Sequence, residues 1–257
     1  MSRIGLAIAL AIAAVVGVVF AIFPQFDIAI SALFYEPRTH RFVVGGGAWE
    51  VAREVASWII TLLVAPALLA VVGKVVMPRR RMLIEARAVL LLVTTLALGP
   101  GLLANQVLKQ HSGRMRPADI VELGGTHHFT PWWDLRGECT ENCSFIAGEP
   151  SGAFWTLAPA ALAPPQWQVL AYGGALAFGA LVGVLRIAAG GHFFTDVVFA
   201  GVFMFLLVWT AHGLIYRWPA TRLSEETIER PLVQIGEALR QGLAALARLA
   251  RRTGKPS

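Results

Sequence analysis

The chain has 257 residues, of which 56% are hydrophobic and only 15% are charged, and its mean hydropathy is +0.62. Soluble domains of this size carry about 25% charged residues, so the composition excludes an ordinary soluble protein and indicates a membrane protein. The formal net charge of +6 does not indicate nucleic-acid binding, because the arginines are not clustered on a soluble segment.

Six apolar segments are long enough to cross a bilayer, which takes about 20 helical residues. The first has no convincing small-residue cleavage site, so we interpret it as a membrane span and not as a signal peptide. Prolines interrupt the fourth. The predicted fold class is therefore an all-α, polytopic membrane helical bundle of six transmembrane helices. The segments are roughly residues 4–23, 52–77, 86–108, 150–163 with its flanks, 168–189 and 193–216.

Basic residues predict the orientation of these spans. They gather between spans two and three and again after span six. Because Lys and Arg concentrate in cytoplasmic loops, we expect both termini to be cytoplasmic and the loops 24–51 and 109–149 to face outward. The basic residues concerned are Arg79, Arg80, Arg81, Arg87, Arg217, Arg222, Arg230, Arg240, Arg248, Arg251, Arg252 and Lys255.

Two segments outside the spans are amphipathic. Residues 24–43 mix aromatic side chains with Asp27 and Arg38, and we expect them to lie at the outer membrane interface. From Ser224 onward, apolar residues recur at helical spacing among arginines. Residues 221–257 are therefore predicted as a basic amphipathic cytoplasmic tail on the inner leaflet, following a membrane domain of residues 1–220.

A cationic cluster follows the third span directly. Lys109, Arg114 and Arg116 lie within the nine residues KQHSGRMRP. Arg presents a planar fork and Lys a point charge, and both suit an anion of high charge density such as phosphate. Contact with lipid head groups is the simpler explanation, but the positive-inside rule works against arginines on the outer side.

The next loop combines aromatic residues with His127 and His128, as expected for a lid over a lipid head group. A metal site at the two histidines is the less favoured alternative, because no matched carboxylate accompanies them. Cys139 and Cys143 are a candidate disulfide if the loop faces an oxidising compartment. Zinc is the weaker alternative, because no nearby histidine has finger-like spacing.

A glycine-rich turn leads into the fourth span. Backbone N–H groups at a helix start near Gly148 can point at an anion. Glu149, the next residue, would be repelled by phosphate when ionised. When protonated, it could instead donate a proton to a leaving oxygen. A loop carboxylate without a chemical role is the alternative.

Arg186, His192 and Asp196 lie in otherwise apolar surroundings where the fifth span ends and the sixth begins. Charged groups at such depth are costly and are mostly functional. If a helix begins near His192, then His192 and Asp196 lie at positions i and i+4 on one face. The carboxylate can then hold one imidazole nitrogen and free the other, as in an oriented histidine nucleophile or base.

These stretches resemble the three signature motifs of the type 2 phosphatidic acid phosphatase superfamily, over about residues 20–215. Lys109 with Arg116-Pro117 is similar to the first motif, and Arg186 with His192 and Asp196 is similar to the third. Their order and their positions relative to the spans match as well. A glycine turn that contains Ser144 and Phe145 stands where the second motif belongs.

The resemblance implies a role for each matched residue. His192 would be the nucleophile that forms a phosphohistidine, and Asp196 would orient it. Lys109, Arg116 and Arg186 would bind the phosphoryl oxygens and stabilise the transition state. The family needs no metal or other cofactor. We add Arg114 and Gly148 as candidate phosphate-binding residues.

The second motif departs from the family pattern Pro-Ser-Gly-His, whose histidine is the general acid. Anchoring on Ser144-Phe145 and Ala153-Phe154 places the motif on residues 146–149, so that Glu149 replaces the acid. Literal identity places it on residues 150–153 and leaves no acid. We prefer the first alignment, because Glu can deliver a proton and Ala cannot. With the run GRMRP at residues 113–117, the Glu variant resembles the branch that contains bacterial lipid A 4′-phosphatases.

The predicted function is hydrolysis of a phosphate monoester on a lipid head group, on the periplasmic side of a bacterial inner membrane. Lipid A is the first candidate substrate, followed by phosphatidylglycerophosphate or undecaprenyl pyrophosphate. Transfer of the phosphate to another lipid and non-catalytic phospholipid binding remain open alternatives. The membrane setting disfavours a haloperoxidase, which can share this constellation. The expected partners are membrane lipids and not nucleic acid.

Overall fold

The computed structural model describes residues 2–253, apart from the side chains of Ala48 and of residues 247–253. The predicted basic residues Arg248, Arg251, Arg252 and Lys255 lie outside the described side chains. Two compact units make up the chain. One is Met1–Leu63 with Thr94–His212, and the other is Val64–Val93 with Gly213–Ser257. The predicted division at residue 220 remains a prediction.

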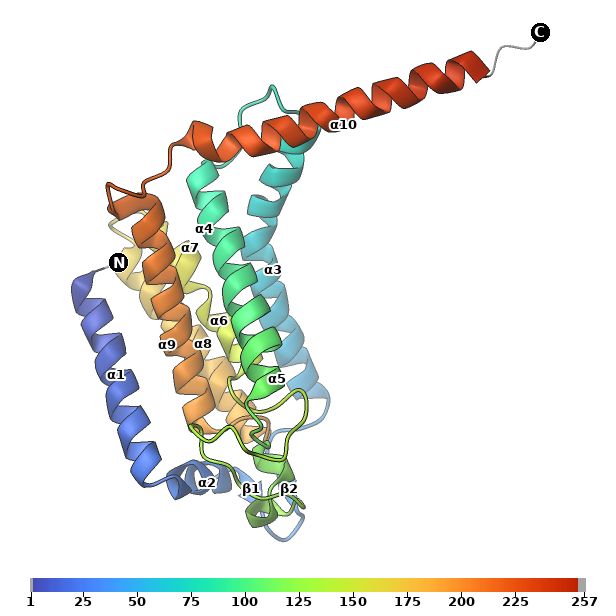
Figure 1. Ribbon diagram of the computed structural model, residues 1–257. Coiled ribbons are helices and arrows are strands. Elements are labelled where there is room, and N and C mark those ends of the chain that lie inside the picture. Colours follow the sequence, from blue (N-terminus) through green and yellow to red (C-terminus); the bar gives the residue numbers. More distant parts are fainter. Residues whose placement is uncertain (1, 254–257) are drawn as a thin grey trace. The chain divides into compact units, whose positions relative to one another are not determined.

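Helices form most of the described chain (Figure 1). Two two-residue strands, β1 Tyr35–Glu36 and β2 Arg41–Phe42, form an antiparallel hairpin that the all-α prediction did not include. The α-helices are α1 Arg3–Ile22, α2 Gln25–Ala32, α3 Gly47–Val76, α4 Ala86–Leu96, α5 Lys109–His111, α6 Gly148–Phe154, α7 Leu157–Ala161, α8 Gln168–Ala188, α9 Phe194–His212 and α10 Glu225–Thr253. The other helical segments are η1 Ala97–Leu108 and η4 Gly213–Arg217, both π-helical, and the 3₁₀ turns η2 Pro117–Asp119 and η3 Val121–Leu123.

Five helices among the described residues are long and apolar enough to cross a membrane. Their outward side chains are largely apolar: Val15 is 63% exposed and Val169 is 85% exposed. Apolar surface on this scale indicates contact with lipid. The chain is therefore a multi-pass membrane protein. The five helices are Arg3–Ile22, Trp49–Val76, Ala86–His111, Gln168–Ala188 and Phe194–Arg217.

The sixth predicted span is not confirmed. Residues 150–163 fall on α6 and α7, which have 7 and 5 residues and are separated by a turn at Trp155 and Thr156. At 1.5 Å per residue, each is far shorter than the ~30 Å hydrocarbon core. Both are buried, and α6 packs against α8, α9 and η1. The second motif therefore lies in the core of the first unit.

The helix before the cationic cluster is π-helical around Pro100, which has no N–H to donate. The side-chain amide of Asn105 donates to the carbonyl oxygen of Pro100 at 2.7 Å. This bond ties the Asn105 side chain to the backbone of the irregular helix. The helix continues to Lys109 and so delivers that residue to the end of the unit.

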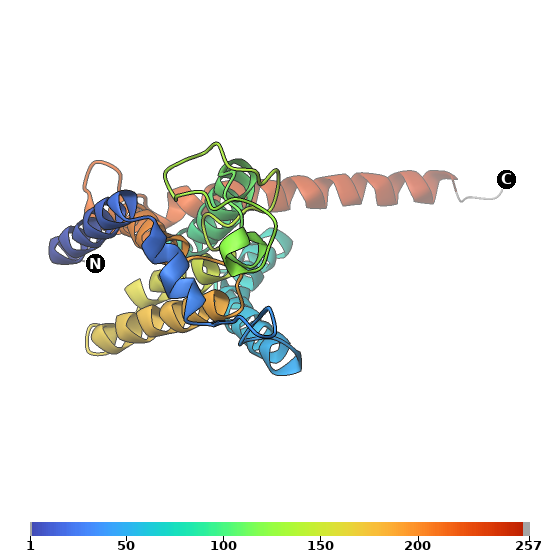
Figure 2. The same cartoon turned by 90° about the horizontal axis from the view of Figure 1, so that it is seen from below.

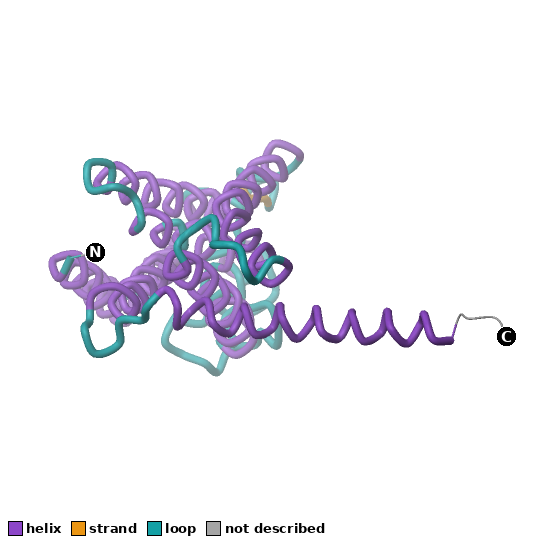
Figure 3. The backbone as a smooth tube through the Cα atoms, turned by 90° about the horizontal axis from the view of Figure 1, so that it is seen from above, coloured by secondary structure: helices purple, strands orange, loops and turns teal. Residues whose placement is uncertain are grey.

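Polar loops gather at one end of the first unit. α2, the β1–β2 hairpin and the loop of residues 112–147 lie together there, as Figures 1 and 2 show. Residues 24–43, predicted as one amphipathic segment, form α2 and the hairpin. Figure 3 shows how little of the chain is strand. The turn between α8 and α9, which carries His192, belongs to the same end: the N–H of Ala118 donates to the carbonyl oxygen of Gly190.

The second unit ties α10 to residues 64–93. Glu229 pairs with Lys74, and Glu225 pairs with Arg87 at 2.8 Å. Ile235, Leu239, Leu243 and Leu246 on α10 are exposed, as predicted for an amphipathic helix. Contact of that face with the inner leaflet remains a prediction.

Candidate active site

His192 lies in the turn that precedes α9, and its side chain is almost fully buried. Its Nδ1 is 2.7 Å from the backbone carbonyl oxygen of Ser144. Because a carbonyl oxygen only accepts, Nδ1 carries the proton and donates it. In the neutral ring, Nε2 is then unprotonated. Burial also lowers the pKa of His192, and the nearby carboxylate of Asp196 offsets this only in part.

Asp196 is further from His192 than the helical spacing predicted. The helix begins at Phe194, so Asp196 lies in its first turn, and Oδ2 is 3.7 Å from Nδ1 of His192. That distance is too long for a hydrogen bond. Oδ2 instead accepts from the backbone N–H of Phe193 at 2.8 Å and from the hydroxyl of Ser144. Asp196 thus holds in place the backbone at Phe193 and the loop at Ser144, the two segments that position the imidazole.

Arg114 is fully buried against Asp196 and lines neither of the two cavities that reach the other predicted phosphate-binding cations. Its guanidinium donates to Asp196, to Asp27 at 2.7 Å and to the carbonyl oxygen of Thr130 at 3.0 Å. A phosphate-binding role for Arg114 does not fit this position, because these groups occupy its donors. Arg114 instead compensates two buried carboxylates, each of which would be costly alone.

Asp27 completes this buried network from α2. Its carboxylate accepts from the backbone N–H of Thr195 at 3.0 Å and from the Thr195 hydroxyl at 2.6 Å. These contacts cap the first turn of α9. The sequence did contain a signal for this role of Asp27, because a carboxylate inside an apolar segment needs a buried partner.

Three of the predicted phosphate-binding cations come together near His192. Lys109 interacts electrostatically with Arg116 and Arg186, and both arginines act on His192. Arg116 also donates to the carbonyl oxygen of Asn142 at 3.0 Å. Arg186 is largely buried, and its Nε has no hydrogen-bond partner among the described residues. The three cations form a concentrated positive field next to a buried imidazole.

Glu149 lies in the first turn of α6 and points at these cations. Its Oε1 accepts from Nε and Nη2 of Arg53 at 3.0 and 2.7 Å, and its Oε2 is 3.8 Å from Nε of Arg186. Arg53 comes from α3, which the sequence reasoning did not include in the site. The sequence did contain a signal for Arg53: it lies at the outer end of a predicted span, where the positive-inside rule disfavours a basic residue without a function.

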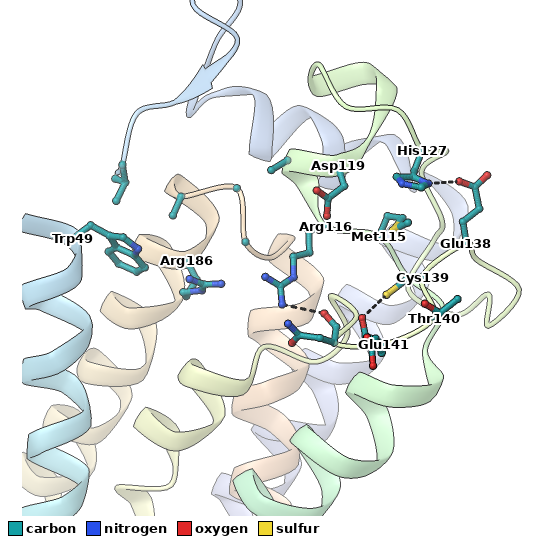
Figure 4. A pocket seen from close by; sticks show the side chains of 16 residues that line it. Trp49, Met115, Arg116, Asp119, His127, Glu138, Cys139, Thr140, Glu141 and Arg186 are labelled. Atoms are coloured by element: carbon teal, nitrogen blue, oxygen red, sulfur yellow. Dashed lines mark hydrogen bonds and ion pairs between the residues drawn. The ribbon is translucent and has the colours of Figure 1, made fainter. Parts of the chain in front are cut away.

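Two cavities reach this cluster. The first, of about 770 Å³, is lined by Arg116, Arg186, Gly190 and Gly191. Figure 4 shows Trp49 and Arg186 on one wall of it and His127, Glu138 and Glu141 on the other, with Arg116 between them. His192 follows the two glycines in the chain and does not itself line the cavity. His127 pairs with Glu138 at 2.8 Å.

The second cavity, of about 210 Å³, is lined by Arg53, Lys109, Gly148 and Glu149. A Cβ atom at residue 148 would lie 2.7 Å from Oδ1 of Asn105 and 3.3 Å from Nζ of Lys109. The first contact is too close and would displace Asn105, and the second would crowd Lys109. Glycine at position 148 therefore lets Lys109 approach the start of α6.

The loop that carries the two cysteines runs beside the first motif. Backbone N–H groups of Cys143 and Ser144 donate to the carbonyl oxygens of Lys109 and Arg114 at 2.8 Å each. Cys139 and Cys143 form a disulfide, with their Cα atoms 5.7 Å apart. Ser144, and with it the contact to His192, is therefore held at the foot of this loop.

The two alignments of the second motif place different residues near the cations. Glu149 and Gly148 line the smaller cavity, whereas Ala153 is fully buried and lines none of the cavities described here. The hydroxyl of Ser151 donates to the carbonyl oxygen of Ala147 within the helix. The geometry thus favours the alignment on residues 146–149.

Comparison with known proteins matches the same part of the chain. The family model described as the PAP2 superfamily matches residues 88–223. A lipid A 4′-phosphatase of Francisella tularensis subsp. novicida (strain U112) is 31% identical over 219 residues, which cover 84% of this chain and 98% of that protein. A lipid A 4′-phosphatase of Rhizobium leguminosarum is 38% identical over 104 residues, covering 40% of this chain and 45% of that protein.

A further lipid A 4′-phosphatase, from Rhizobium etli, is 35% identical over 102 residues, which cover 40% of each chain. No solved structure matches the chain. The family match includes the residues that resembled the first and third motifs, from Lys109 to Asp196. On this match and on the full-length relative, the chain belongs to the PAP2 superfamily.

Proposed function

We propose that this membrane protein hydrolyses the phosphate monoester of lipid A through a phosphohistidine intermediate on His192, at the periplasmic face of a bacterial inner membrane. The hydrogen bond from Nδ1 of His192 to the carbonyl oxygen of Ser144 is the observation that carries the proposal. This bond favours the tautomer whose proton is on Nδ1, which leaves the Nε2 lone pair for attack on phosphorus.

The reaction has two balanced steps. In the first, Nε2 forms a bond to phosphorus while the bond from phosphorus to the lipid oxygen breaks, and the leaving oxygen takes up a proton. In the second, water attacks the phosphohistidine and gives a proton to the Glu149 carboxylate, the P–N bond breaks to restore the neutral imidazole, and inorganic phosphate leaves. Lys109, Arg116 and Arg186 bind the phosphoryl oxygens and stabilise the charge that spreads over them in the transition state.

Glu149 supplies the proton to the leaving oxygen in this proposal. Its position in the cavity beside Lys109 supports the role. The same geometry supports metal-independent chemistry, since Lys109, Arg116 and Arg186 are available to meet the charge on phosphate.

A lipid substrate fits the surroundings of the site. An apolar cavity of about 490 Å³ is lined by Ile59 and Leu63 of α3, Ala160 of α7 and Phe178 of α8. Residues of α3 and α8 also line the cavity that contains Lys109 and Glu149. An acyl chain can occupy the apolar cavity while the phosphorylated head group reaches the cations. The relatives named lipid A 4′-phosphatase make lipid A the first candidate.

Phosphate release by the purified protein in detergent tests the proposal. Lipid A, phosphatidylglycerophosphate, phosphatidic acid and undecaprenyl pyrophosphate are compared with EDTA present, beside a His192→Ala variant. We expect release from lipid A that survives EDTA and is lost in the variant. Release from another lipid alone would overturn the substrate assignment, and release that EDTA abolishes would overturn metal independence. Turnover retained by the variant would overturn the nucleophile.

A further inference from the structure

We propose that Arg53, which lies outside all three motifs, is a fourth phosphate-binding residue of this site. Its guanidinium and that of Arg186 converge on one anion-binding position, which the carboxylate of Glu149 occupies in the structure. The inference rests on the proposed function and adds a substrate-binding residue to it.

The contacts of Glu149 define the position. Oε1 accepts from both Nε and Nη2 of Arg53, at 3.0 and 2.7 Å, and Oε2 lies 3.8 Å from Nε of Arg186. One arginine comes from α3 and the other from the end of α8. A phosphate oxygen is the same kind of acceptor as a carboxylate oxygen and suits the planar fork of Arg equally well.

Trp49 holds the two guanidinium groups near each other. It lies four residues before Arg53 on α3, so both side chains are on one face of the helix. The centre of its ring is 5.9 Å from Cζ of Arg53 and 5.6 Å from Cζ of Arg186. Cation–π attraction at these distances keeps two like charges beside one aromatic surface.

The position has more donors than the carboxylate uses. Nε of Arg186 is buried without a hydrogen-bond partner among the described residues. Lys109 interacts electrostatically with Arg53, Arg116 and Arg186. Three phosphoryl oxygens can therefore be met at once, whereas Glu149 offers two oxygens. We infer that the phosphoryl group displaces the carboxylate from Arg53, which frees Glu149 to protonate the leaving oxygen.

A purely structural role for Arg53 is weakly supported. Its side chain is 47% exposed and that of Glu149 is 35% exposed, and ion pairs this open contribute little to stability. The remaining alternative is that Arg53 only positions Glu149 and never touches phosphate. The two roles differ in one respect: a positioning role disappears when Glu149 loses its charge, and a phosphate-binding role does not.

A double-mutant cycle separates them. The inhibition constant of inorganic phosphate is measured for the wild type, Arg53→Gln, Glu149→Gln and the double variant, and its dissociation constant is measured by calorimetry. We expect Arg53→Gln to weaken phosphate binding by about tenfold or more, the size of a lost charge-assisted hydrogen bond. Glu149→Gln alone should tighten it, because a competing carboxylate is removed. Arg53→Gln should weaken binding by a similar factor in the Glu149→Gln background.

No effect of Arg53→Gln in the Glu149→Gln background would overturn the inference and leave Arg53 as a positioning residue. Glu54→Gln, at the next position on α3, and Arg136→Gln, on an exposed loop, are matched controls that should bind phosphate as the wild type does. Arg53→Lys keeps the charge and loses the fork, so it should bind phosphate with intermediate strength. If the wild type hydrolyses none of the lipids, the proposed function fails, and calorimetry with inorganic phosphate still decides the role of Arg53.

Discussion

Ser144 connects the carboxylate of Asp196 to the imidazole of His192. Its hydroxyl donates to Oδ2 of Asp196, and its backbone carbonyl oxygen accepts from Nδ1 of His192 at 2.7 Å. The direct distance from Asp196 to His192 is 3.7 Å. The carboxylate therefore positions the ring largely through Ser144, in addition to its electrostatic effect across that distance.

A phosphoenzyme is the first consequence of a nucleophilic His192. Wild-type protein quenched during turnover of a ³²P-labelled lipid should carry label that is labile in acid and stable in alkali, as a P–N bond is. His192→Gln should carry none and should release phosphate at least about a thousandfold more slowly. Label with the opposite lability would indicate a hydroxyl nucleophile instead.

Ser144→Ala tests the connection between Asp196 and His192. The substitution removes a donor from a buried carboxylate, so we expect a loss of about 1–3 kcal/mol in the free energy of unfolding. We also expect a lower kcat, because the loop that holds the imidazole is less constrained. Denaturant unfolding and phosphate release measure the two effects.

Ser31→Ala is the matched control for that experiment. Ser31 is also fully buried, but its hydroxyl has no hydrogen-bond partner among the described residues. The variant should therefore be as stable and as active as the wild type. An equal loss in both variants would assign the effect to removal of any buried hydroxyl and would contradict a specific role for Ser144.

Local patterns made much of the candidate site predictable. Lys109 and Arg116 belong to one short run, and His192 and Asp196 are four residues apart, so spacing alone relates each pair. The same reasoning overestimated the contact between His192 and Asp196, because the helix starts at Phe194 and not at His192. The same reasoning also predicted a sixth long span at residues 150–163, where the structure has the two short, largely buried helices α6 and α7.

Long-range pairs were not predictable in this way. Arg114 and Asp27 are 87 positions apart, and Arg53 and Glu149 are 96 positions apart, so no helical period relates them. The apolar sequence around these charged residues indicates only that each of them needs a partner of opposite charge. Which partner it has depends on how α2 and α3 pack against later elements, and that is a property of the fold.

Arg114→Met tests the buried network. It leaves Asp27 and Asp196 uncompensated in a buried setting, so we expect a loss of about 3–5 kcal/mol in the free energy of unfolding. Adding Asp27→Asn should recover part of that loss, since one of the two unpaired charges is removed. Thermal unfolding of the single and double variants in the same detergent measures both effects.

Arg114→Lys separates that structural role from the predicted phosphate-binding role. Lysine keeps the positive charge beside the two carboxylates, so part of the protein should fold. The folded fraction should bind inorganic phosphate as tightly as the wild type does, because Arg114 does not line the cavities near the cations. Weaker phosphate binding by the folded fraction would restore Arg114 to the substrate site.

The activity should persist into mildly acidic solution. Burial lowers the pKa of His192 below its ordinary value of 6.5, and attack needs the neutral ring. The acid limb of kcat/KM should therefore lie below pH 6.5. Because phosphate monoesters also titrate near pH 6, the profile is measured with two substrates whose phosphate pKa values differ. If the acid limb of kcat/KM lies at the same pH for both substrates, it reports a group of the enzyme and supports the assignment to His192. A limb that moves with the substrate, or one above pH 6.5, would contradict the prediction.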